Sequence, residues 1–217
     1  MTLAFAAFTR RGEDLARRLA QQFGGSVTRI DKENPLPVWT AQQFSEKEGL
    51  VFVGAVGIAV RAIAPHLRHK TTDPAVVAVD EGGRFAIPLV SGHLGGANAL
   101  AQAVAAHLGA IPVITTATDG RGLFAVDSWA NAQGCLVKEP ERIKWVSSKV
   151  LDGKQIQLRC PWPISGEKPD EVSLTEEETC DAAVTLYQEE NTALHLLPKA
   201  LTLGVGCRKG TSQAALE

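Results

Sequence analysis

The chain has 217 residues, of which 45% are hydrophobic and 21% are charged, so it has enough apolar side chains for a packed core and is not typical of a disordered protein. It has no uncharged apolar run of the ~18 residues that a membrane-spanning helix needs. Its formal net charge of −2 lacks the basic excess of a general nucleic-acid-binding protein.

The first 132 residues are predicted to alternate between strands and helices. Short apolar runs indicate strands, and helices are indicated where apolar residues recur about every four positions, as at Leu15, Leu19 and Phe23. The predicted strands are Leu3–Phe8, Leu50–Val53, Ala75–Val79, Phe85–Val90 and Ile111–Thr115. The predicted helices are Arg11–Phe23, Thr40–Glu48, Ile58–Leu67, Leu94–Leu108 and Leu123–Ala132. This alternation indicates an α/β fold with a mainly parallel sheet flanked by helices, interrupted by one antiparallel hairpin over residues 75–90.

The pattern changes after Ala132, and residues 133–200 are predicted to form a second, smaller α/β domain. Its predicted elements are the strands Cys135–Val137, Gln155–Cys160, Asp181–Tyr187 and Ala193–Leu197 and the helix Glu139–Leu151. Residues 201–217 begin with another predicted strand, Leu201–Val205, and a glycine-rich loop. A lone strand cannot bury its own apolar side chains, so we expect this segment to be poorly packed or to dock as an orphan strand, as the truncated start of a further domain.

The cysteines and histidines are not spaced as in a metal site. The four cysteines are Cys135, Cys160, Cys180 and Cys207. They form no CxxC pair, so we expect reduced thiols, as is usual in the cytoplasm. His66 and His69 lie at the end of a predicted helix and are expected to cap its last carbonyls rather than to bind a metal.

Glycine-rich turns follow three of the predicted strands. In the first, Gly54 and Gly57 precede the helix that carries Arg61. The free N–H groups of a helix start favour an anion, and glycine lets it approach closely. The same glycines would also serve a tight turn with no ligand.

The second turn has a composition that is unusual for a plain connection. It contains Ser91, Gly92, His93, Gly95, Gly96 and Asn98. The imidazole of His93 can act as an acid or a base near neutral pH. Backbone N–H groups of residues 92–96 could stabilise an oxyanion, and Asn98 could orient a carbonyl or carboxylate.

The third turn places hydroxyl and charged side chains after a strand. Its candidate residues are Thr115, Thr116, Asp119 and Arg121. Ligands of open α/β sheets bind outside the carboxyl ends of strands, although such a turn can also cap the next helix. Asp119 is the second catalytic candidate, as a base or as the group that orients an imidazole.

Residues 49–119 resemble the N-terminal domain of the CbiG family, the cobalt-precorrin-5A hydrolases of anaerobic cobalamin biosynthesis. The motifs that carry the resemblance are GAVGIAVRAIAP, DPAVVAVDEGGR, PLVSGHLGGAN and PVITTATD. Residues 133–197 resemble the variable middle domain of the family. The run LTLGVGCRKGTS, residues 201–212, is similar to the opening of its C-terminal domain.

The resemblance implies a hydrolase that acts on a carbon–carbon bond. Water opens the δ-lactone of cobalt-precorrin-5A, and acetaldehyde leaves to give cobalt-precorrin-5B. Cobalt arrives with the tetrapyrrole substrate, so no cofactor and no protein metal site are expected. Methyltransferases that act on neighbouring intermediates are the expected protein partners. Two other functions stay open: a corrinoid-binding fragment without catalysis, and a generic α/β protein that binds anionic ligands.

The substrate is a polycarboxylate, and the turns offer groups that could receive it. The predicted substrate-binding residues are Gly54, Gly57, Arg61, Ser91, Gly92, Gly95, Gly96, Asn98, Thr115, Thr116 and Arg121. Arg68 is a further cation that could receive a carboxylate. His93 and Asp119 are the predicted catalytic residues.

Overall fold

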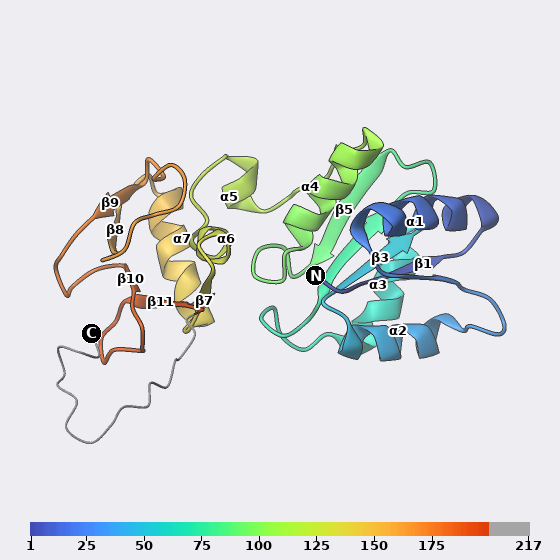
Figure 1. Ribbon diagram of the computed structural model, residues 1–217, viewed down its shortest axis with the longest axis horizontal. Helices are drawn as coiled ribbons and strands as arrows, with labels where there is room; N and C mark the ends of the chain where they lie inside the picture. Colours follow the sequence, from blue (N-terminus) through green and yellow to red (C-terminus); the bar gives the residue numbers. More distant parts are fainter. Residues whose placement is uncertain (200–217) are drawn as a thin grey trace, which may run out of the picture.

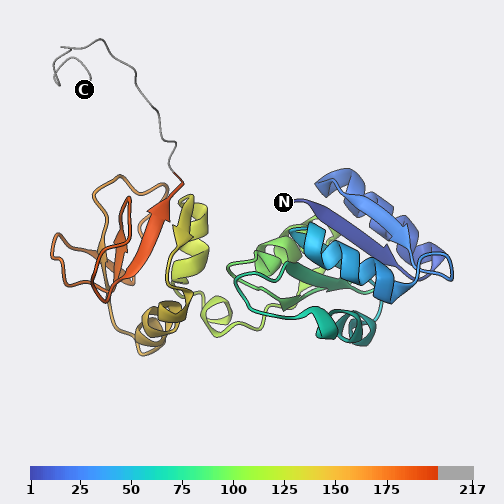
Figure 2. The same ribbon diagram turned by 90° about the horizontal axis from the view of Figure 1, so that it is seen from below.

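The computed structural model describes residues 1–199, apart from the side chain of Asp119 (Figure 1). These residues form two sheets, one of six strands and one of five, each with its own hydrophobic core. The two units are joined through the segment that carries the short helix α5 (Ala117–Gly120) (Figure 2). The predicted α/β fold with a mainly parallel sheet and a smaller second unit is confirmed.

The first sheet has the strand order β2-β1-β3-β4-β5-β6. Its strands are β1 (Leu3–Ala7), β2 (Ser26–Arg29), β3 (Gly49–Val53), β4 (Ala75–Val79), β5 (Phe85–Val90) and β6 (Ile111–Pro112). The first four are parallel, β5 is antiparallel to β4, and β6 is parallel to β5. The edge strand β2 is half exposed, which explains why it lacks the apolar run by which the central strands are recognised.

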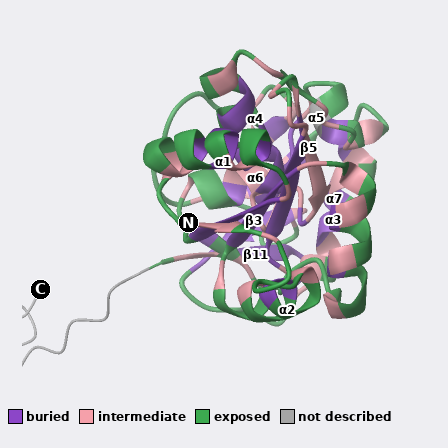
Figure 3. Ribbon diagram, turned by 90° about the vertical axis from the view of Figure 1, so that its right-hand side faces the viewer, coloured by how far each residue is buried: buried purple, intermediate pink, exposed green. Residues whose placement is uncertain are grey.

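Two helices cover each face of this sheet. The helices are α1 (Arg10–Phe23), α2 (Leu36–Glu46), α3 (Val56–Ile63) and α4 (Ala97–Leu108). Apolar residues of α1 and α4 pack with Phe5 and Val51 on one face, whereas those of α2 and α3 pack with Phe52 on the other. Figure 3 shows the buried strands in purple between helices whose outer surfaces are green and exposed. Strands covered on both faces must be apolar throughout, as β1, β3 and β4 are.

The turn between β4 and β5 is held by a carboxylate. Asp80 Oδ1 accepts the amides of Arg84 and Phe85, each at 2.7 Å. Burial disfavours the ionised carboxylate of Asp80, but these hydrogen bonds together outweigh it and lower its pKa. The left-handed residue of the turn is Gly83, at φ 66°. The antiparallel hairpin predicted from the sequence is confirmed.

The second sheet has the order β7-β11-β10-β8-β9. Its strands are β7 (Cys135–Val137), β8 (Ile156–Arg159), β9 (Val172–Leu174), β10 (Ala182–Val184) and β11 (Leu194–Pro198). All neighbours are parallel except β7, which is antiparallel to β11. The accompanying helices are α5 (Ala117–Gly120), α6 (Val126–Ala132) and α7 (Ile143–Leu151).

The second core starts earlier in the chain than predicted. Phe124, Val126 and Ala130 pack with the apolar residues of the second sheet, so α6 belongs to this unit although the predicted first domain extends to Ala132. The helix predicted over Ile58–Leu67 also differs, because α3 ends at Ile63 and a 3-10 turn follows over Ala64–His66. The predicted strand Leu201–Val205 and the rest of residues 201–217 lie outside the described residues. Within residues 1–199, we find no helix both long and apolar enough to cross a bilayer.

Candidate functional site

The second and third glycine-rich turns lie together at one edge of the first sheet. Because β5 runs against β4, Val90 pairs with Val76 near the start of β4, and the loop after β5 lies at the amino-terminal edge of the parallel strands. β6 runs parallel to β5, so Thr116 comes to the same edge. Asn98 Nδ2 donates to Thr116 Oγ1 at 3.1 Å, and this bond joins the two turns.

The loop before α4 is compact and depends on its glycines. A Cβ on Gly95 would lie 2.3 Å from Ser91 Cβ, and one on Gly92 would lie 2.9 Å from Asn98 Oδ1. Ser91 adopts φ 58° and Gly96 adopts φ 83°, a region that non-glycine residues seldom occupy. The loop therefore has one tight conformation that places His93 between the two units.

The start of α4 uses several of its amides within the loop itself. The amides of Gly96, Ala97 and Asn98 donate to the carbonyls of His93, Ser91 and Gly92 at 2.9, 3.0 and 2.9 Å. These three donors at the helix start are thus engaged. The oxyanion site predicted over residues 92–96 therefore cannot use the amide of Gly96 while the loop keeps this conformation.

An aspartate from the second unit faces His93. Asp127, in the first turn of α6, places Oδ2 3.3 Å from His93 Nδ1. The His93 side chain is 18% exposed and that of Asp127 is 7% exposed. Asp127 Oδ1 also accepts the amide of Ser128 at 3.1 Å. The carboxylate lies close enough to Nδ1 to form an ion pair with the protonated imidazole.

Asp127 is not among the residues predicted from the sequence, and Asp119 was predicted as a base or as the group that orients an imidazole. The available signal was an acid within residues 123–130, a run that is apolar apart from Asp127 and Ser128, since a buried acid needs a partner. Asp119 lies in α5, directly after the Thr116 turn. Thr115, also a predicted binding residue, is exposed.

Ser91 holds a neighbouring loop in place. Its hydroxyl donates to the carbonyl of Asp73 at 2.8 Å, and the carboxylate of Asp73 accepts the amide of Arg68 at 3.0 and 3.1 Å. The basic loop, which we define as Arg68, His69 and Lys70, is exposed beside the Ser91 turn. Ser91 thus has a structural role, and Arg68 is the predicted arginine that lies at this edge.

The first glycine-rich turn lies elsewhere. Gly54 follows the last residue of β3 and donates its amide to Val79 O at 2.8 Å, at the carboxyl edge of the parallel strands. Five-residue strands separate the two edges by about 13 Å. A Cβ on Gly54 would lie 2.7 Å from Phe8 Cδ2, so this glycine serves close packing. Arg61 Nη1 donates to the carbonyl of Gly57 at 3.3 Å. The structure does not bring Gly54, Gly57 or Arg61 to the His93 loop.

Arg121 contacts the carboxyl end of α7. Its Nη1 donates to the carbonyl of Leu151 at 3.2 Å, at the end of α7, where the helix dipole favours a cation. This contact gives Arg121 a structural role.

Across the described part of the chain, no group of three His, Cys, Asp or Glu side chains is placed to hold a metal ion.

Comparison with known proteins gives concordant matches. Residues 38–119 match the sequence profile described as "Cobalamin synthesis G N-terminal". The chain is 32% identical to a cobalt-precorrin-5A hydrolase of Priestia megaterium, over 99% of this chain and 67% of the relative. It is 34% identical to a cobalt-precorrin-5A hydrolase of Salmonella typhimurium, over 97% and 67%. The chain thus spans about two thirds of the length of these relatives.

The fold has a counterpart among solved structures. A cobalamin biosynthesis protein G homolog from Sulfolobus solfataricus superposes with a TM-score of 0.56 at 20% identity. The match covers 91% of this chain and 60% of that one. At this level of identity the likeness shows the fold alone.

Proposed function

The chain belongs to the cobalt-precorrin-5A hydrolase family, and on this premise we propose that it opens the δ-lactone of cobalt-precorrin-5A and releases acetaldehyde to give cobalt-precorrin-5B. The observation that carries the proposal is the His93–Asp127 pair. Its two members come from different units and meet at 3.3 Å in a largely buried position.

The pair has the chemistry that lactone hydrolysis needs. Nε2 of His93 accepts a proton from the attacking water, and Asp127 stabilises the imidazolium that forms. Water adds to the lactone carbonyl, and the ring C–O bond breaks to give a carboxylic acid and an oxygen on the former meso carbon. As this oxygen becomes the carbonyl of acetaldehyde, the bond from the former meso carbon to the macrocycle breaks, and the macrocycle takes up a proton. One water is consumed for each acetaldehyde released.

The surroundings of the pair suit an anionic substrate. The exposed basic loop, Arg68, His69 and Lys70, lies at the same edge of the sheet as the Ser91 turn. Its cations can bind peripheral carboxylates of the tetrapyrrole. Asn98 and Thr116 are polar and are joined by a hydrogen bond between the two turns. Asp119 stays the second candidate for the base because of its position in the chain after Thr116.

We extend the proposal to the cofactor, the location and the partners. Cobalt enters and leaves as part of the substrate, so the protein supplies no cofactor of its own. We place the enzyme in the cytoplasm, consistent with the free thiols of Cys135, Cys160 and Cys180. Methyltransferases that supply or consume the corrinoid are its proposed neighbours.

The direct experiment incubates the chain with cobalt-precorrin-5A and measures acetaldehyde with a coupled alcohol dehydrogenase. Release of one equivalent of acetaldehyde per substrate supports the proposal. Corrinoid binding without acetaldehyde would instead support a binding fragment. Thermal stabilisation by phosphorylated metabolites but not by tetrapyrrole carboxylates would support the generic anion-binding alternative.

A further inference from the structure

The second unit has a hollow at the carboxyl ends of its parallel strands. The pocket has a volume of about 650 Å³ and lies where β8 and β10 end. The chain leaves β8 for β9 on one side and leaves β10 for β11 on the other. β8 and β10 therefore flank a topological switch point, the place where open α/β sheets bind ligands. The volume falls within the range of small-molecule sites, about 300–1,000 Å³.

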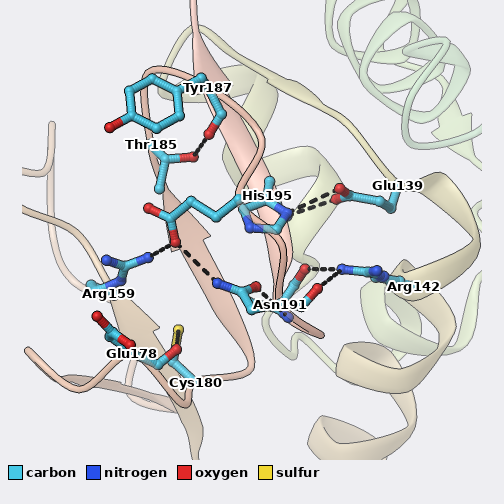
Figure 4. A network of polar contacts seen from close by, with 11 residues as sticks. Glu139, Arg142, Arg159, Glu178, Cys180, Thr185, Tyr187, Asn191 and His195 are labelled. Carbon is cyan, nitrogen blue, oxygen red and sulfur yellow. Dashed lines mark hydrogen bonds and ion pairs between the residues drawn. The ribbon is translucent and has the colours of Figure 1, made fainter.

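Aromatic and apolar side chains are exposed around this pocket. Trp162 is 42% exposed, Leu186 61% and Tyr187 71%, and all three line the pocket. Tyr187 is the one tyrosine of the chain. The turn that carries it is fixed, because Thr185 Oγ1 donates to the carbonyl of Tyr187 at 2.7 Å (Figure 4). Exposed apolar groups gathered in a concave place mark a binding site more often than scattered ones do.

A fixed arginine lies at the same strand ends. Arg159, the last residue of β8, pairs with Glu189 through Nη2. Glu189 also accepts from Asn191 Nδ2 at 3.0 Å, and the carbonyl of Asn191 accepts from Arg142 Nη1 at 3.0 Å (Figure 4). The hydrogen bond that Arg159 donates to Glu189 raises the pKa of the guanidinium.

One donor of this arginine has no protein acceptor. Nε of Arg159 is buried and makes no hydrogen bond within the described residues. A buried donor without an acceptor is unfavourable. Because Nε is covered in this conformation, the guanidinium must turn toward the pocket before an oxygen atom of a ligand can accept from it. The acids Glu176 and Glu189 also line the pocket. Since Arg159 neutralises only one of them, the pocket suits a ligand that presents one acceptor group rather than several carboxylates.

The hollow continues toward the helix that carries Asp127. A second cavity of about 230 Å³ shares Cys160, Trp162 and Leu186 with the first and reaches Trp129 of α6. Nε1 of Trp129 is likewise buried without a hydrogen-bond partner among residues 1–199. The two cavities thus connect the ends of the parallel strands with α6.

We propose that this pocket binds one edge of the tetrapyrrole, with the ring against Tyr187 and Trp162 and one oxygen of a peripheral side chain accepting a hydrogen bond from Arg159 Nε. The identity of the ligand rests on the proposed function. The pocket is too small for a whole macrocycle, so it takes one pyrrole-derived ring with its side chains. The rest of the substrate extends beyond the pocket.

The test measures corrinoid binding by equilibrium dialysis with two probes. Cobyrinic acid carries free carboxylates, and cobinamide carries amides on the same kind of ring. Tyr187→Ala is expected to weaken both by about three- to tenfold, as expected for a lost aromatic contact. Arg159→Met is expected to weaken cobyrinic acid by about tenfold or more and cobinamide by less. Trp145→Ala, on α7 and 57% exposed, is the matched control and is expected to change neither.

The outcomes separate this inference from the proposed function. Tyr187 is 71% exposed, so we expect Tyr187→Ala to fold normally and to test the pocket even if Arg159→Met disturbs the loop around Glu189. Unchanged binding of both probes by Tyr187→Ala would overturn the inference, as would no binding to the unaltered chain. If the unaltered chain releases acetaldehyde and Tyr187→Ala binds both corrinoid probes as well as the unaltered chain does, the pocket inference is wrong and the proposed function stands. If the unaltered chain releases no acetaldehyde but Tyr187→Ala binds the corrinoid probes more weakly than the unaltered chain does, the proposed function is wrong and the pocket inference stands.

Discussion

Replacing Asp127 with asparagine tests whether its charge supports His93. Asparagine has nearly the same volume and retains an oxygen for the amide of Ser128, so the change removes mainly the charge. At 3.3 Å and an effective dielectric constant of about 20, two unit charges attract by about 5 kcal/mol. This value is an upper bound, because His93 is partly exposed and solvent screens the pair. We therefore expect kcat to fall by about 10²- to 10³-fold.

The assay is acetaldehyde release from cobalt-precorrin-5A under saturating substrate, with thermal unfolding measured in parallel. Asp152→Asn is the control, because the side chain of Asp152 is exposed (59%) at the end of α7 and its carboxylate forms an exposed ion pair with Lys154. Asp119→Asn is the informative comparison, since Asp119 is the acid predicted from the sequence, as a base or as the group that orients an imidazole. Unchanged turnover in Asp127→Asn together with a large loss in Asp119→Asn would refute the assignment.

Three further predictions concern folding and the loop. Gly95→Ala places a Cβ 2.3 Å from Ser91 Cβ, so we expect a loss of about 1–3 kcal/mol in unfolding free energy and lower activity. The control is Gly109→Ala, because a Cβ on Gly109 would meet no atom within 4 Å. This control should lose stability only because an alanine is strained in the left-handed backbone conformation of Gly109. Asp80→Asn should lower the unfolding free energy by about 1–2 kcal/mol at pH 7, as measured by urea unfolding. Because the pKa of Asp80 is lowered in the folded protein, this difference is present above the pKa of the unfolded chain and should vanish as the pH falls through the folded pKa. An equal difference at pH 2 and pH 7 would contradict this prediction. His195 is fully buried, and its Nδ1 lies in a hydrogen bond with Glu139 at 2.9 Å. Glu139→Ala removes this partner, so we expect the unfolding free energy to fall by about 3–5 kcal/mol. A loss below 1 kcal/mol would show that the pair is not structurally important.

The central strands could be predicted well from the sequence. β4 and β5 begin and end at the predicted residues, because a strand covered on both faces is apolar throughout and the turn between them is rich in glycine. The edge strand β2 was not predicted, since its half-exposed residues carry no such pattern. The short β6 was predicted to be longer, to Thr115, because an apolar run does not show how many of its residues pair with the neighbouring strand.

The grouping of the site residues was predicted only in part. The antiparallel hairpin was predicted correctly, and its direction already implies that the Ser91 loop and the Gly54 turn lie at opposite edges of the sheet. We instead expected all strand ends to share one site. Asp127 could not be placed from the sequence, because its contact with His93 depends on how α6 packs against the second core and not on local spacing.

The central claim is that His93 performs the acid–base chemistry of the hydrolysis. The most direct measurement is acetaldehyde release by His93→Ala, with cobyrinic acid binding measured on the same protein and His107→Ala as the control. We predict that kcat falls by about 10²-fold or more while corrinoid binding stays within a few-fold of the unaltered chain. Undiminished acetaldehyde release by His93→Ala would contradict the mechanism.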